Sequence, residues 1–123
     1  MLGAMLSVEE KTMLKSYAQR LAALEEALIA LCGEGEPGTR LLRFWLVFLT
    51  ATSARQIPPS LRQIFVDIKS HFCDEQRGAI NQYSEAALTE LRGKIVMLYR
   101  DWSAYMALAR WQANAEEKRE QLE

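Results

Sequence analysis

The stretch LKSYAQRLAALEEALIAL, residues 14–31, decides the fold class of this chain. Its large apolar residues recur every three or four positions, at Leu14, Tyr17, Leu21, Leu24, Leu28 and Leu31. That spacing places all of them on one face of an α-helix. A capping-box pair, Ser7 and Glu10, precedes the stretch, and the glycine-rich run of residues 33–38 follows it. We therefore expect a long first helix that begins at Ser7 and ends at Leu31.

Two shorter segments with helical periodicity flank the sequence Pro58-Pro59-Ser60. The first, from Thr39 to about Arg55, is apolar around most of its circumference, which is typical of a helix buried among others. Its expected inward side carries Leu42, Trp45, Leu46 and Leu49, extended by Leu41 and Phe48. The proline pair ends this segment and opens a third helix, because proline is tolerated only in a first turn. The apolar stripe of that third helix is Leu61, Ile64, Phe65, Ile68 and Phe72.

A fourth helix is expected from Ser84 to about Glu120. Its stripe again has three- and four-residue spacing: Leu88, Leu91, Ile95, Leu98, Trp102, Tyr105 and Ala109. No alternating pattern is long enough for a strand. We predict an all-α chain that forms one domain over residues 1–123, a four-helix, bundle-like fold with long first and last helices and a buried second helix. Residues 1–6 would be an N-terminal extension, and residues 116–123 a polar tail that frays into solvent.

The composition favours a cytoplasmic protein. Fifteen basic residues against sixteen acidic ones leave a net charge of -1, so the bulk charge indicates neither a nucleic acid nor an anionic membrane as partner. The most apolar run, residues 41–51, contains Arg43 and is shorter than the ~20 residues that a membrane span needs. Cys32 and Cys73 are expected to be reduced, buried thiols, with a bridge between them as the alternative.

Catalytic motifs are weak in this sequence. His71 and Cys73 stand two positions apart, so on a helix their side chains diverge and cannot form a nucleophile–base pair. The Gly33-Glu34-Gly35 run lacks the Lys-Ser/Thr of a phosphate loop. We therefore predict no enzymatic activity and no catalytic, cofactor or metal site; a deep pocket with convergent polar groups would support the alternative.

Apolar residues beyond the main stripe of the last helix indicate a protein partner. We place Met97, Tyr99, Met106, Leu108 and Trp111 off that stripe. Tryptophan and methionine are enriched at the centres of interfaces, so we take Met97, Tyr99, Met106 and Trp111 as candidate partner-binding residues. The predicted function is a non-enzymatic helical interaction module, an accessory, adaptor or regulatory subunit of a larger assembly, with a homodimer as one form.

The alternative function is nucleic-acid binding. Residues 39–73 hold five bases and one acid, and the five bases are Arg40, Arg43, Arg55, Arg62 and Lys69. A cluster of this kind can contact phosphates without reading sequence. The competing interpretation is that these bases pair with the acidic segments on either side of them.

Overall fold

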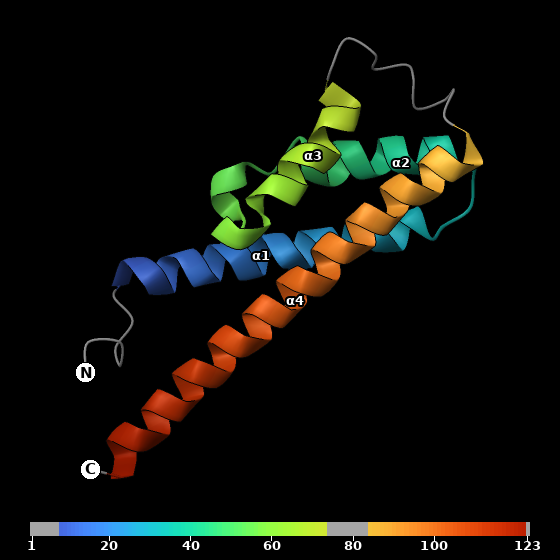
Figure 1. Cartoon of the computed structure of the whole chain (residues 1–123). Helices are drawn as coiled ribbons and strands as arrows, with labels where there is room; N and C mark the ends of the chain where they lie inside the picture. Colours follow the sequence, from blue (N-terminus) through green and yellow to red (C-terminus); the bar gives the residue numbers. More distant parts are fainter. Residues whose placement is uncertain (1–7, 74–83, 123) are drawn as a thin grey trace.

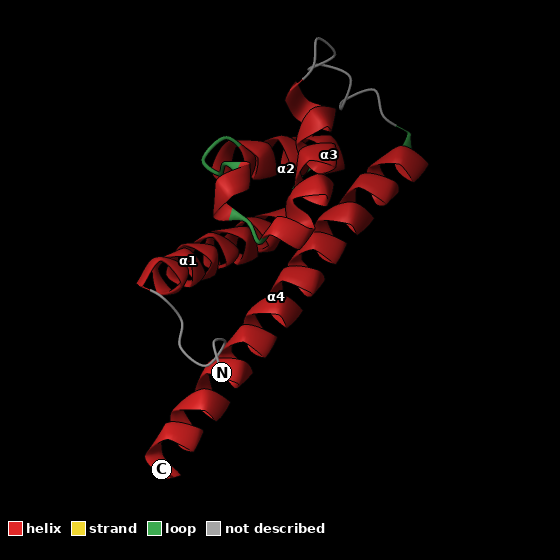
Figure 2. Cartoon of the chain, turned by 60° about the vertical axis from the view of Figure 1, so that its left-hand side comes forward, coloured by secondary structure: helices red, strands yellow, loops and turns green. Residues whose placement is uncertain are grey.

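The computed structural model describes residues 8–73 and 84–122, and this part of the chain is helical with no strand (Figure 2). Its main elements are α1 (Val8–Leu31), α2 (Pro37–Phe44), α3 (Arg62–Cys73) and α4 (Glu85–Leu122). The predicted all-α domain of four helices, with long first and last helices, is confirmed. The extension 1–6 and the capping residue Ser7 lie outside the described residues.

Helices α1 and α4 cross each other in antiparallel directions (Figure 1). The ring of Tyr17 meets that of Tyr105 edge to face, with 6.1 Å between centroids. Further along α1, the carboxylate of Glu25 accepts a hydrogen bond of 3.2 Å from the Tyr99 hydroxyl. Later residues of α1 thus contact earlier residues of α4, as expected for antiparallel helices. Beyond this crossing, the C-terminal part of α4 extends past the other helices.

The second helix differs from its prediction in shape and in the placement of Leu46. It begins at Pro37, in a first turn where the missing N–H costs no hydrogen bond. After Phe44 it widens into a π-helical segment, η1 (Trp45–Leu49), in which the Thr50 N–H donates to the Trp45 carbonyl at 3.1 Å.

Within η1, neighbouring side chains point in opposite directions. Phe48 and Leu49 are fully buried, whereas Leu46 and Val47 are 62% and 50% exposed. The second helix is buried through Leu41, Phe44, Phe48 and Leu49, which are all 0% exposed, but Leu46, which was predicted to face inward, meets solvent. Leu46 was misplaced because, at about 100° per residue, it lies roughly 140° around the helix from the buried Leu41.

The aromatic core is centred on Phe48. Its ring lies 5.6 Å from that of Phe44, 6.2 Å from that of Phe65 and 6.4 Å from that of Trp102, measured between centroids. All four side chains are at most 1% exposed. Because they come from α2, η1, α3 and α4, this cluster joins three helical regions that are distant in sequence.

Short 3-10 turns, η2 (Ala54–Gln56) and η3 (Pro59–Leu61), reverse the chain between η1 and α3. The predicted stripe of α3 is confirmed, because four of its five members are buried and Ile64 is half-buried against the core. Beside this stripe, Asp67 forms an ion pair of 2.9 Å with Lys94 of α4. Helices α3 and α4 are thus held by both apolar and charged contacts.

Helix α4 begins after Ser84, whose hydroxyl accepts a hydrogen bond of 3.1 Å from the Ala87 N–H. Its predicted stripe packs inward: Leu88, Leu91, Ile95, Leu98 and Trp102 are buried, and Tyr105 and Ala109 are half-buried. Residues 116–122 continue the helix to Leu122.

Candidate interaction surface

A second apolar stripe runs along the outward side of α4. We call it the outer stripe, and its members are Met97, Ala104, Leu108, Trp111, Ala115 and Leu122. Its four large side chains are well exposed: 44% for Met97, 56% for Leu108, 66% for Trp111 and 88% for Leu122. Helix α4 is therefore apolar on two faces, of which one packs on the core and the other meets solvent.

The predicted partner-binding residues divide between these two faces. Met97 and Trp111 lie on the outer stripe, as does Leu108. Tyr99 is half-buried and donates its hydroxyl hydrogen bond to Glu25, so it belongs to the α1–α4 contact.

Met106 was assigned to the wrong face. It is only 9% exposed and belongs to the core. It follows Leu88 by five complete helical turns, so both residues point the same way.

Sequence reasoning missed Ala104, Ala115 and Leu122. Alanine gives no strong hydropathy signal, and Leu122 stands within the charged C-terminal segment. A regular seven-residue repeat was the signal that could have identified them: Met97, Ala104 and Trp111 form one series, and Leu108, Ala115 and Leu122 form the other.

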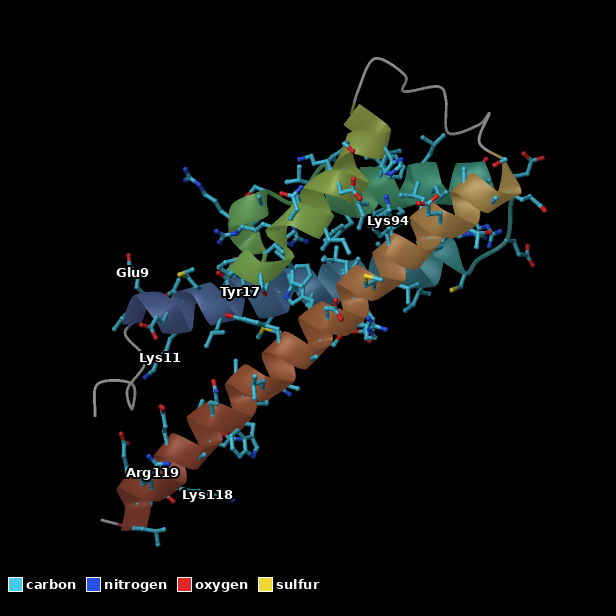
Figure 3. The ribbon with its side chains drawn as sticks, viewed as in Figure 1. Glu9, Lys11, Tyr17, Lys94, Lys118 and Arg119 are labelled. Atoms are coloured by element: carbon cyan, nitrogen blue, oxygen red, sulfur yellow. The ribbon has the colours of Figure 1, made fainter. Side chains whose placement is uncertain are left out.

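A groove opens between the N-terminal half of α1 and the C-terminal half of α4. Its volume is about 350 Å³, and its walls are mainly apolar and aromatic. The lining residues include Met13, Leu14, Tyr17, Tyr105 and Ala109, with Gln112 and Glu116 at the α4 side. Tyr17 is 2% exposed, and its hydroxyl has no hydrogen-bond partner among the described residues. Figure 3 labels this residue on α1.

Two of the five basic residues predicted to contact nucleic acid serve as internal hydrogen-bond donors. The Nη1 of Arg40 donates to the carbonyls of Leu31, at 2.9 Å, and of Gly33, at 3.3 Å. These carbonyls lie at the C-terminal end of α1, where helix geometry leaves them without partners and the helix dipole favours a cation. Arg62 Nε likewise donates to the Ile57 carbonyl at 3.0 Å.

The other three bases have different surroundings. Lys69 is half-buried, with its Nζ 5.7 Å from the centre of the Phe65 ring, a cation–π contact. Arg43 and Arg55 are exposed. Among residues 8–73 and 84–122, none of the five forms an ion pair with a carboxylate. The predicted pairing with acidic segments is therefore wrong for the described residues. Arg40 and Arg62 contact backbone carbonyls instead, and Lys69 contacts an aromatic ring.

The described histidine and cysteine do not converge. His71 is half-buried on α3, whereas Cys32 is a free, exposed thiol, so its predicted burial is wrong. The side chain of Cys73 is not among those described. Within the described ranges, no three His, Cys, Asp or Glu residues lie close enough to hold a metal ion.

No helix in residues 8–73 and 84–122 combines the length and apolar character that crossing a membrane requires. Comparisons of the whole chain with known protein families, with curated proteins and with solved structures found no match.

Proposed function

We propose that this protein is a non-enzymatic helical interaction module, an accessory, adaptor or regulatory subunit that binds a protein partner through the outer stripe of α4. The observation that carries this proposal is the exposure of Met97, Leu108, Trp111 and Leu122 on one face of a single helix. Single apolar residues are normal on a protein surface, but several large ones aligned on one helix face favour an interaction site. Burial of these side chains would supply the driving force for association.

The chemistry of the stripe favours a protein as its partner. Tryptophan and methionine are over-represented at the centres of protein interfaces, where they contribute large contact areas. A phosphate backbone would instead require free cations on one open face. Arg40 and Arg62 donate hydrogen bonds within the fold, and Lys69 covers an aromatic ring. These contacts favour a structural role for most of the basic segment.

The proposal is tested by pull-down from a lysate of the cells that make this protein. The proteins retained by the tagged, full-length wild type are compared with those retained by a variant and a control. The variant carries Leu108→Ala and Trp111→Ala. The control carries Ile29→Ala, which truncates a large apolar residue of α1 that is at least as exposed (69%). We expect a protein retained equally by the wild type and the control, and at least tenfold less by the variant. Retention of the same proteins by all three chains, or of none by the wild type, would refute the proposal.

A further inference from the structure

The six residues of the outer stripe belong to a heptad repeat whose two remaining positions, Asp101 and Lys118, are charged. One series is Met97, Ala104, Trp111 and Lys118; the other is Asp101, Leu108, Ala115 and Leu122. Each series advances by seven residues, and together they alternate by three and four, which is the pattern of a coiled-coil seam. Asp101 and Lys118 thus occupy seam positions near opposite ends of the stripe.

The two series become complementary when a second α4 is laid antiparallel on the first, centred on the peptide bond between Ala109 and Arg110. Leu108 then lies level with the partner's Trp111, and Ala104 with the partner's Ala115. Met97 lies level with the partner's Leu122, and Asp101 with the partner's Lys118. By two-fold symmetry each pairing occurs twice, as in an isologous interface.

We propose that the outer stripe binds a second copy of this chain in this antiparallel register, so that the protein forms a symmetric dimer through α4. The inference rests on the proposed function and names its partner. Charge complementarity carries it, because the antiparallel register brings each Asp101 carboxylate opposite an ammonium group. Within its own helix this carboxylate also contacts the Arg100 Nε at 3.3 Å, and its side chain is still 43% exposed. A parallel arrangement would instead place Asp101 against the partner's Asp101 and Lys118 against the partner's Lys118, which is repulsive.

The size match within the stripe supports the same register. Ala104 lies opposite the partner's Ala115 in two layers, so that small residues face small ones. Leu108 lies opposite the partner's Trp111 in the two central layers, which are filled by large side chains. Large and small layers alternate in this way when helices pack closely. The register therefore leaves neither a clash between large side chains nor a gap between small ones.

The position of the stripe leaves room for a partner. Residues 97–122 span about 37 Å, or roughly three and a half heptads, a length sufficient for a coiled coil. The buried residues of α4, such as Trp102, face the other helices, so the outer stripe points away from them. Figure 3 shows Lys118 on the part of α4 that lies furthest from the other helices. The remaining helices of each copy would lie outside the central pair.

Charge reversal provides the decisive experiment, with sedimentation equilibrium of the full chain as the measurement. We expect the wild type to approach twice its mass of 14.1 kDa as concentration rises. Asp101→Lys and Lys118→Asp should each raise the dimer dissociation constant at least tenfold, by creating like-charge pairs. The doubly reversed chain should return to within about threefold of the wild type, because the opposite charges face each other again.

A cysteine experiment tests the direction of the helices. Two variants are made in a chain that carries Cys32→Ser and Cys73→Ser: one adds Ala104→Cys and the other adds Ala115→Cys. When the two variants are mixed, a disulfide should link one chain of each kind. Neither variant should form a disulfide-linked dimer on its own. Cross-linking of Ala104→Cys with itself would overturn the proposal. The charge-reversal series needs no change at the native cysteines, so it decides the question even if that background does not fold.

The two proposals fail in distinguishable ways. The dimer is refuted if the wild-type chain stays monomeric up to about 200 µM. It is also refuted if the doubly reversed chain dimerises more weakly than either singly reversed chain. If Leu108→Ala with Trp111→Ala still abolishes capture of a different protein, the interaction module remains supported. The Ile29→Ala control should dimerise like the wild type, and an equal loss in that control would also refute the proposed interface.

Discussion

Replacement of Phe48 by alanine tests whether the π-helical segment places this ring at the centre of the core. Phe48 is 0% exposed, and its ring contacts those of Phe44, Phe65 and Trp102. Leu46 lies in the same segment but is 62% exposed. The pair Phe48→Ala and Leu46→Ala therefore compares an inward and an outward position within one turn.

The two variants should lose very different amounts of the free energy of unfolding. Removal of a buried phenylalanine costs about 3–5 kcal/mol, from lost transfer free energy and the cavity left behind. The exposed Leu46→Ala change should stay within about 0.5 kcal/mol of the wild type. A domain of this length has a free energy of unfolding of roughly 6–18 kcal/mol, so both losses are measurable.

Urea unfolding followed by circular dichroism is the assay. With an m-value of about 2 kcal/mol/M, the midpoint of Phe48→Ala should fall by roughly 2 M, and that of Leu46→Ala by less than about 0.3 M. If Phe48→Ala does not fold at all, Phe48→Leu should also lower the unfolding midpoint, by a smaller amount. Equal losses at the two positions, or a greater loss at Leu46, would refute the assigned register.

Three further outcomes follow from individual contacts. Arg40→Met should lower the free energy of unfolding by about 1.5–3 kcal/mol, measured in urea, because it leaves α1 carbonyls without their charged donor; an unchanged midpoint would contradict this role. The hydrogen bond from Lys94 lowers the pKa of Asp67 below its ordinary value of 3.8. The stability that this pair supplies is thus present above pH 3.8 and is lost as the pH falls through the lower folded-state value. An NMR titration should place the Asp67 midpoint below 3.8, and Lys94→Met should return it towards 3.8; the same midpoint in both chains would show that the ion pair is not the cause. Gly93→Ala should raise the free energy of unfolding by about 0.5–1 kcal/mol, and the melting temperature with it, because alanine favours the helix and its Cβ would meet no neighbouring side chain or other segment within 4 Å; a lower melting temperature would disprove this.

Three of the four helices could be predicted from periodicity, because each carries a regular stripe that ends at a clear signal. In α1 that stripe is continuous from Leu14 to Leu31, and in α4 Ser84 marks the start. The π-helical turn could not be predicted, since it depends on how Phe48 packs against rings from distant segments. Tertiary packing determined the local geometry there.

The candidate surface was only partly predictable for a similar reason. Trp111 and Met97 were identified because they are large and lie off the first stripe. Met106 was misplaced because its relation to Leu88 appears only when whole turns are counted. The part played by Arg40 depends on carbonyls at the end of another helix, which residue spacing does not reveal.

The length of α4 affects how the mass of this protein has to be measured. Its 38 residues extend about 57 Å, whereas a compact chain of this size would be about 35 Å across. The particle is therefore elongated, with a higher frictional ratio than a sphere of equal mass. It should elute early from a gel-filtration column calibrated with globular standards, so that a monomer would imitate a larger species. Light scattering or sedimentation, which do not assume a round shape, give the true stoichiometry.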